Sequence, residues 1–483
     1  MTAKRQGSSG HPSKLRTPEL LLFAAADLFG GGGQAIISVL FFVFMTNVLR
    51  ISPGWAGTIV MITKIWDAVF DPMLGVISDN TRGRMGRRRP YIFWGGVLLL
   101  GAMALLWLPV SFESEIARVV YVTAAYLFYC TVSSMIAIPY ASMSTEITAE
   151  FQLTNRVNMT RLVFSLVATA IYTLLPTMLF DRLTDGSLTP VGFYLIVVLG
   201  LGAPLAIPVI LTGLLARERV PYGEHKSSFS LDVFIRPLKV RAFRKLLALY
   251  LAQSITLDII STVILYYGMY VVPGISATVF LGAFLGIQLL LFPVMSRMIN
   301  TVPKTTIYRF GLPLSILGAA GIAFFPSGGS PALVYALAAL TALGFAGAQT
   351  MTWIMFPDVV DIGDLSLGER ITGSFGGLMS FIRTISYAIA AFIIGQALTW
   401  AGFITPGGSD PSPLQPDSTL WTIRLIILLS FVLLMGGAWV AAGRFPLSPA
   451  LSKNVKSLLQ KREAGRLDAE DQAHRDQIIR DLG

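Results

Sequence analysis

The 483-residue chain is poor in charge, cysteine and histidine. Charged residues make up 13% of it, about half of the roughly 25% that is usual in soluble domains. Its one cysteine, Cys130, excludes a disulfide framework within the chain. The three histidines, His11, His225 and His474, fall in polar segments, which argues against a histidine relay or a histidine metal site inside an apolar span. The remainder is 54% hydrophobic with a mean hydropathy of +0.67, so lipid is the expected solvent of most of the chain.

Apolar stretches long enough to cross a bilayer recur along the whole sequence, since about 18 to 20 such residues make one spanning helix. We predict an all-α membrane protein with two six-helix bundles at 19–215 and 244–443, joined by a central loop at 216–243. Tails are expected at 1–18 and 444–483, and the first of these has no cleavage motif of a signal peptide. The twelve helices are predicted at 19–48, 55–78, 91–110, 118–145, 157–180, 191–215, 244–271, 277–300, 307–325, 332–355, 373–402 and 420–443.

Positive charge gathers in alternate loops, and loops rich in Lys and Arg stay on the cytoplasmic side of a membrane. The segment from Asp79 to Tyr91 has five arginines, and the segment from Ala216 to Lys245 has eight Lys or Arg residues. The intervening loops, such as "RISPG" and "VPGIS", have almost none. We therefore predict cytoplasmic termini and a location in a cell membrane. The net charge of +10 then reflects these loops and not a nucleic-acid partner.

The predicted helix at 55–78 has three charges where charge is costly, about 2.5–3.5 kcal/mol each at the bilayer centre. Asp67 and Asp71 are i,i+4 neighbours on one helix face, and Lys64 precedes Asp67 by three residues. Two such carboxylates suit Na⁺ or a shared proton, whereas a structural cluster that only packs the helices is the alternative. We predict a cation site at Asp67 and Asp71, tuned by Lys64, with no other metal and no cofactor beyond the coupling ion.

Other polar groups inside the predicted spans are candidate contacts for a polar solute. The single charges in these spans could equally form structural ion pairs, and Tyr and Trp also gather at membrane interfaces. Aromatic faces and amides nevertheless suit a hydroxyl-rich ligand such as a sugar. The substrate-site candidates are Asp27, Tyr126, Arg161, Gln253, Asp258, Gln349, Trp353 and Arg383.

The arginine-rich loop before residue 91 has two interpretations. Its charges anchor the topology of the chain, or they form ion pairs that close the cytoplasmic side and break when it opens. Those pairs would involve Asp79 or the acids of "PDVVDIGDLSLGER" at 357–370. The candidates for this cytoplasmic gate are Asp79, Arg82, Arg87, Arg88, Arg89, Asp358, Asp361 and Asp364.

The stretch "KIWDAVFDPMLGVISDNTRGRMGRRRPYIFWG" at 64–95 resembles the glycoside–pentoside–hexuronide:cation symporters, the melibiose-permease-like branch of the major facilitator superfamily. A second similar stretch is "AIPYASMSTEITAEFQLTNRVNMTRLVF" at 137–164. The resemblance implies twelve helices, alternating access and the uptake of a sugar or glycoside with Na⁺ or H⁺. It also implies that Asp67 and Asp71 are the cation ligands.

Several positions depart from the sugar carriers of that family. Lys64 replaces their usual arginine, and Gly31, Ala137 and Thr384 stand where some of them have acids and a lysine. A lysolipid or other amphiphile carried by the same fold is therefore the alternative cargo. A multi-span membrane enzyme and a receptor that does not transport are further alternatives, and the lack of histidine in the predicted spans disfavours the enzyme. The expected partners are a small-molecule substrate and the lipid bilayer, and the expected state is a monomer.

Overall fold

The computed structural model describes residues 15–219, apart from 145 and 149, and most of the chain from 231 onward. Parts of the predicted tail at 1–18 and of the predicted loop at 216–243 lie outside the described residues. Within the described residues the fold is helical, with one isolated bridge between Gly83 and Gly86. The described ranges after residue 230 are 231–298, 304–326, 329–369, 371–406, 413–445, 447, 449–464, 466 and 468–482.

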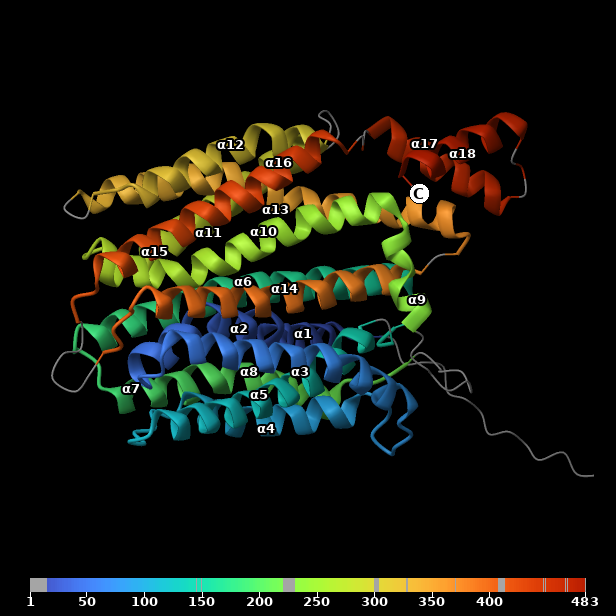
Figure 1. The fold of residues 1–483 in the computed structure, drawn as a ribbon. Helices are drawn as coiled ribbons and strands as arrows, with labels where there is room; N and C mark the ends of the chain where they lie inside the picture. The colour runs from blue at the N-terminus through green and yellow to red at the C-terminus, as the bar shows by residue number, and fades with distance from the viewer. Residues whose placement is uncertain are drawn as a thin grey trace, which may run out of the picture.

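The helices of the first half run back and forth along one common direction (Figure 1). The first pass is interrupted at Ala26 and ends in π-helical turns. Proline opens two of the helices, at a position where its missing N–H would be unbonded anyway. The elements are α1 (Thr17–Ala25), α2 (Asp27–Ile36), η1 (Ile37–Phe41), η2 (Phe44–Val48), α3 (Pro53–Asn80), α4 (Arg89–Trp107), α5 (Glu115–Met143), α6 (Phe151–Thr184), α7 (Pro190–Leu195), η3 (Ile196–Leu201) and α8 (Gly202–Leu215).

The second half forms a matching set of long helices beside the first, coloured from light green to red in Figure 1. Two further helices follow the last long pass. The elements are α9 (Leu231–Ile235), η4 (Arg236–Lys239), α10 (Arg241–Tyr266), η5 (Tyr267–Val271), α11 (Ala277–Met298), α12 (Lys304–Ala323), α13 (Pro331–Leu367), α14 (Thr372–Trp400), α15 (Asp417–Leu429), η6 (Ser430–Met435), α16 (Gly436–Gly443), α17 (Pro449–Glu463) and α18 (Ala469–Leu482).

Eleven helical stretches in the described residues are long and apolar enough to cross a membrane. The helix α3 is not among the eleven, although it has 28 residues, because Lys64, Asp67 and Asp71 lower its hydropathy. It nevertheless packs against α14 of the second half and α5 of the first, while its other face is exposed. Its charges therefore face protein at least as much as lipid, which is the arrangement that a charged span requires.

The two halves touch closely at the end of the molecule where α3 begins, which we call the Pro53 face. A Cβ atom added at Gly395 would lie 2.3 Å from the Pro53 carbonyl oxygen, so α14 and α3 meet backbone to backbone. The N–H of Gly54 donates to the Thr399 hydroxyl at 2.8 Å. Hydrogen bonds also join Thr46 to Tyr266, Asn47 to Tyr270 and Thr278 to Thr177 and Asp181.

The opposite end, which we call the basic face, has the loop between α3 and α4 together with α9, α17 and α18 (Figure 1). The segment predicted as a charged tail at 444–483 thus folds into two helices that pack on α13. Arg462 of α17 donates to the Asp364 carboxylate at 2.5 Å, and Arg241 donates to the Arg480 carbonyl at 2.8 Å. Val455, Leu458, Leu459, Ile478 and Leu482 of the two helices are buried.

Candidate functional site

A cavity of about 610 Å³ lies between the two halves. Its walls come from α2, α3, α5 and α6 of the first half and from α10 and α14 of the second. The cavity therefore contacts both parts that would move relative to each other in a two-half transporter. The predicted site residues that line it are Lys64, Asp67, Asp71, Tyr126, Asp258 and Arg383.

The two acids of α3 have different partners inside this cavity. The Lys64 ammonium donates to Asp67 Oδ2 at 2.8 Å, and the Ser134 hydroxyl of α5 donates to Asp71 Oδ1. The other carboxylate oxygen of Asp67, Oδ1, is buried and has no hydrogen-bond partner among the described residues. A buried charged oxygen without a partner is costly, so this atom is a ready ligand for a cation.

Proline supplies a further oxygen between the two acids. Pro72 lies inside α3 directly after Asp71 and has no N–H to donate to the carbonyl four residues earlier. The Ala68 carbonyl oxygen therefore lacks its usual helical bond, one residue from Asp67. Asp67, Asp71 and Ser134 all line the cavity, and their two carboxylates and hydroxyl are oxygen ligands of the kind that a hard cation prefers. The Ser134 hydroxyl and the Ala68 carbonyl were not predicted, although Pro72 was a visible signal for the second.

Asp258 of α10 and Arg383 of α14 form an ion pair on the opposite wall. Arg383 Nη2 donates to both carboxylate oxygens of Asp258, at 2.9 and 3.1 Å. A second cavity of about 40 Å³ lies beside this pair and is also lined by Lys64. The five charges that line the main cavity are two cations and three carboxylates, a net charge of −1 when all are ionised. One added monovalent cation would make the lining neutral.

Asp27 and Arg161 pair with each other and do not line the cavity. Arg161 Nε donates to Asp27 Oδ2 at 2.8 Å, and the guanidinium lies 4.4 Å from the centre of the Tyr140 ring. The carboxylate of Asp27 begins α2, where the helix dipole favours negative charge. The pair therefore joins α2 to α6, and a contact with substrate stays a prediction.

The glycine run after Asp27 lets α2 approach α6 closely. A Cβ atom at Gly31 would lie 2.1 Å from the Ser165 carbonyl oxygen of α6, so no side chain fits there in this packing. Gly31 is the position where some sugar carriers of the resembling family have an acid. In this chain the backbone of α6 occupies the space, and Ser165 and Thr169 line the cavity nearby.

The amides and the tryptophan lie away from the cavity lining. Gln253 is buried in α10, and its Oε1 atom and that of Gln349 have no hydrogen-bond partner in the part of the chain that the structure describes. Trp353 is 57% exposed and packs edge-on against Tyr250, with 5.6 Å between the ring centres. Tyr250 lines the cavity and was not predicted. The substrate roles of Gln253, Gln349 and Trp353 stay predictions.

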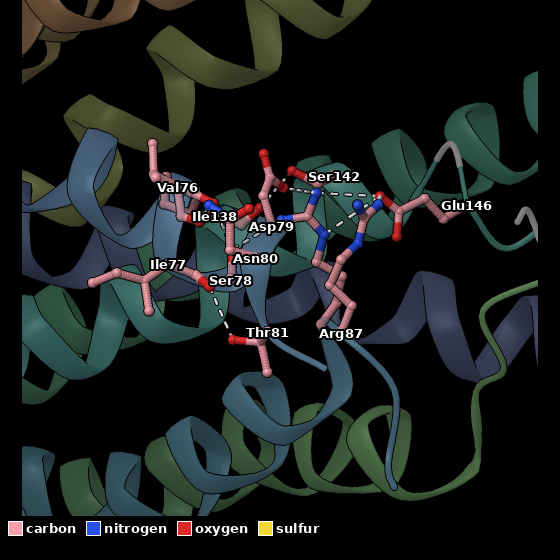
Figure 2. Close-up of polar contacts among 12 residues, drawn as sticks. Val76, Ile77, Ser78, Asp79, Asn80, Thr81, Arg87, Ile138, Ser142 and Glu146 are labelled. Carbon is pink, nitrogen blue, oxygen red and sulfur yellow. Dashed lines mark hydrogen bonds and ion pairs between the residues drawn. The ribbon is translucent and has the colours of Figure 1, made fainter. Parts of the chain in front are cut away.

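The arginines of the basic loop bind acids of their own half. Figure 2 shows Arg87 and Glu146 with the end of α3, and Arg88 pairs with Asp79 and Glu146. The expected pairing of Asp79 with a loop arginine is thus present.

The same loop also makes contacts with backbone groups. Arg82 donates to the Asp79 carbonyl, and Arg89 donates to carbonyl oxygens at the end of α8. Glu218 accepts from the backbone N–H groups of Arg87 and Arg88, and neither Glu146 nor Glu218 was predicted.

The acids expected to face this loop, Asp358, Asp361 and Asp364, are all buried in the last turns of α13. Asp364 pairs with Arg462 of α17, a partner that the sequence interpretation did not consider. The gating role of these acids at the basic face stays a prediction.

Comparison with known proteins places the chain among transporters. The family described as MFS/sugar transport protein matches residues 22–448. An uncharacterized symporter of Synechocystis sp. is 26% identical, over 93% of this chain and 98% of that protein. A putative glycoside/cation symporter of Escherichia coli is 24% identical, over 88% of this chain and 91% of that protein. A structure from a study of proton-dependent oligopeptide transporters shares the fold, with a TM-score of 0.63, 13% identity and coverage of 90% and 99%.

Proposed function

The chain belongs to the MFS/sugar transport protein family, and we propose that it is a twelve-helix symporter that imports a sugar, glycoside or related polar solute with Na⁺ or H⁺. It is a multi-pass membrane protein and a transporter, not an enzyme. The helix α3 is the proposed twelfth span, and both termini lie in the cytoplasm in this proposal. A bacterial inner membrane is the proposed location.

One observation carries the cation part of the proposal. The buried and unpartnered Asp67 Oδ1 lies in a cavity that Asp71 and both halves also line. A cation there would satisfy this oxygen and cancel the net negative charge of the lining. The coupling ion is Na⁺ or H⁺, because carboxylates with a hydroxyl oxygen accept either.

The closed Pro53 face supports alternating access. Hydrogen bonds and backbone contacts between α3 and α14 close the molecule at that face. Rocking of the two halves around a central site would break these contacts and open the cavity to the other side of the membrane. With the basic face in the cytoplasm, this structure is the state in which the outer side is closed.

The lining of the cavity suits a hydroxyl-rich solute. Its volume of about 610 Å³ falls in the usual range of small-molecule sites, about 300–1,000 Å³. The Tyr126 and Tyr250 rings, the Asp258–Arg383 pair and several serines offer aromatic faces and hydrogen-bonding groups. Because Gly31 and Ala137 carry no acid, the solute would be held by the Asp258 side more than in the sugar carriers that have these acids.

Reconstituted vesicles test the proposal. Asp67→Asn and Asp71→Asn, which keep the shape of the side chain, should each reduce Na⁺- or H⁺-driven accumulation of a labelled glycoside at least tenfold. The control Asp185→Asn changes an exposed carboxylate beyond the end of α6 and should transport normally. Full accumulation by both cation-site variants would contradict the mechanism. Uptake of labelled lysophospholipid but of no sugar in the same panel would support the amphiphile alternative instead.

A further inference from the structure

Lys64 is bonded to a carboxylate of its own half and shares a small cavity with a carboxylate of the other half. Its ammonium has three N–H donors, and the structure shows one of them bonded to Asp67 Oδ2 at 2.8 Å. The same side chain also lines the cavity of about 40 Å³ beside Asp258 and Arg383. A water needs about 10–15 Å³ of such space, so only a few waters fit between Lys64 and the Asp258 pair. The field of Lys64 reaches the Asp258 carboxylate.

We propose that Lys64 exchanges partners when the coupling cation binds, leaving Asp67 of α3 for Asp258 of α10. This inference rests on the proposed cation site and gives Asp258 and Arg383 a positioning role in coupling. If Lys64 instead stayed bonded to Asp67, it would only compete with the cation for that carboxylate. The partner exchange converts cation binding into a new contact between the two halves.

Electrostatics gives the reason for the exchange. A cation bound at Asp67 and Asp71 takes the charge compensation that Lys64 supplied and repels the ammonium at short range. The Asp258 carboxylate can accept the ammonium, because its two oxygens have about four lone-pair sites and Arg383 supplies a single nitrogen to them. Lys64 can move there by rotation of its flexible stem, since the space between them is a cavity and not packed side chains.

The exchange changes the charge on one side of the cavity only. Asp67 and Asp71 have a net charge of −1 with Lys64 before the exchange and with one cation after it, whereas the Asp258–Arg383 side goes from 0 to +1 when Lys64 joins it. The new ion pair between Lys64 of α3 and Asp258 of α10 links the two halves and favours a narrower cavity. Loss of the cation returns Lys64 to Asp67 and removes the attraction. The coupling ion thereby controls how readily the halves close on the cavity.

The native cysteine reports on this closure without any engineering. Cys130 is the single cysteine of the chain, and it lines the main cavity. Saturating Na⁺ should slow the reaction of Cys130 with a maleimide at least threefold in the purified wild-type protein. If the coupling ion is H⁺, the rate should fall on acidification at least threefold more than that of a free thiol in the same buffer, since acid slows every thiol by protonating it. Choline chloride at the same ionic strength is the control for the Na⁺ arm.

Asp258→Asn is the decisive variant. It should bind ²²Na⁺, or the coupling proton, more weakly than the wild type, because Lys64 then stays beside Asp67 and competes with the cation, and at saturating cation it should lose the cation-dependent slowing of Cys130 labelling. Asp258→Asn with Arg383→Gln removes both charges of the buried pair and serves if the single variant fails to fold. Asp417→Asn at the exposed start of α15 is the matched control and should label like the wild type.

The outcomes separate the two claims. Cation-dependent slowing that persists in Asp258→Asn and in the double variant overturns the partner exchange and leaves the cation site intact. A wild-type protein that binds neither Na⁺ nor H⁺, or Asp67→Asn and Asp71→Asn variants that bind as well as the wild type, overturns the proposed function itself. Slowing that is lost in both Asp258 variants while cation binding remains supports the exchange.

Discussion

Gly395 of α14 and Pro53 of α3 should make the tightest contact of the Pro53 face, and the variant Gly395→Ala tests this. The new Cβ atom would lie 2.3 Å from the Pro53 carbonyl oxygen and 3.1 Å from the Gly57 Cα atom. Real Cβ atoms do not approach backbone this closely, and neither neighbour is a flexible side chain. The two helices must therefore separate by about an ångström, which loosens the Pro53 face.

The size of the effect follows from the cost of such overpacking. Forcing an extra methyl group into a well-packed contact costs about 1–3 kcal/mol. The cost applies to the state that is closed at the Pro53 face, so the equilibrium should shift toward the open state by roughly 5- to 150-fold. The free energy of unfolding is a poor measure of this cost, because replacing glycine with alanine in a helix itself stabilises the protein by about 1 kcal/mol.

Sided labelling of Cys130 measures the shift. A membrane-impermeant maleimide, added on the side to which the Pro53 face points, should react with Cys130 at least fivefold faster in Gly395→Ala than in the wild type. Gly101→Ala in α4 is the control, because a Cβ atom there meets nothing within 4 Å while the gain in helix propensity is the same. Equal labelling rates in the wild type and Gly395→Ala would refute the assignment of this contact as the closing surface.

Three further predictions concern single contacts. Ser134→Ala removes the hydroxyl that donates to Asp71, and a hydrogen bond to a charged group contributes about 1.5–3 kcal/mol. If Na⁺ is the coupling ion and uses the hydroxyl oxygen, the half-saturating Na⁺ concentration in uptake assays should rise about tenfold. If H⁺ is the coupling ion, the half-saturating proton concentration should fall. Arg161→Gln leaves half-buried Asp27 unpaired and should destabilise the protein by about 3 kcal/mol, the lower end of the range for breaking a buried ion pair. Asp27→Asn with Arg161→Gln should recover most of the melting temperature. The hydrogen bond from Lys461 of α17 lowers the pKa of the Asp471 carboxyl group of α18. This bond therefore stabilises the α17–α18 pair at neutral pH, and the stabilisation is lost below about pH 4 as the carboxylate protonates. Asp471→Asn should show the same loss at pH 7, as faster hydrogen exchange in α18 than in the wild type.

The sequence alone could identify which charged residues belong to a site, because a charge inside a membrane span is costly and usually has a structural or functional role. The i,i+4 spacing of Asp67 and Asp71 places both on one face, and both line the cavity. Their partners could not be predicted in the same way. Ser134 is 63 residues away on another helix, and its contact depends on the rotation and depth of α5 relative to α3, which no local pattern encodes.

The ends of helices show a similar limit. Hydropathy ends the tenth predicted helix at 355, whereas α13 continues to Leu367. The extra turns include Asp358, Asp361 and Asp364, which lower the hydropathy of any window that contains them. They are nevertheless buried, and Arg462 of α17 neutralises Asp364. A polar helix end of this kind becomes visible only when its distant partner is known.

Gly31 explains why the first half has no carboxylate at this point of the cavity wall. An acid at position 31 would require α2 to move away from α6, because even a Cβ atom there would lie 2.1 Å from the Ser165 carbonyl oxygen. The close approach instead brings Ser165 and Thr169 to the cavity wall and keeps Asp27 bonded to Arg161. The first half thus offers hydroxyl groups at this part of the cavity wall, and in the proposed mechanism Asp67 and Asp71 hold the cation. Of the three carboxylates that line the cavity in the described residues, Asp258 is the one that the proposed cation site does not use, so binding of a solute to it should compete with the exchange of Lys64.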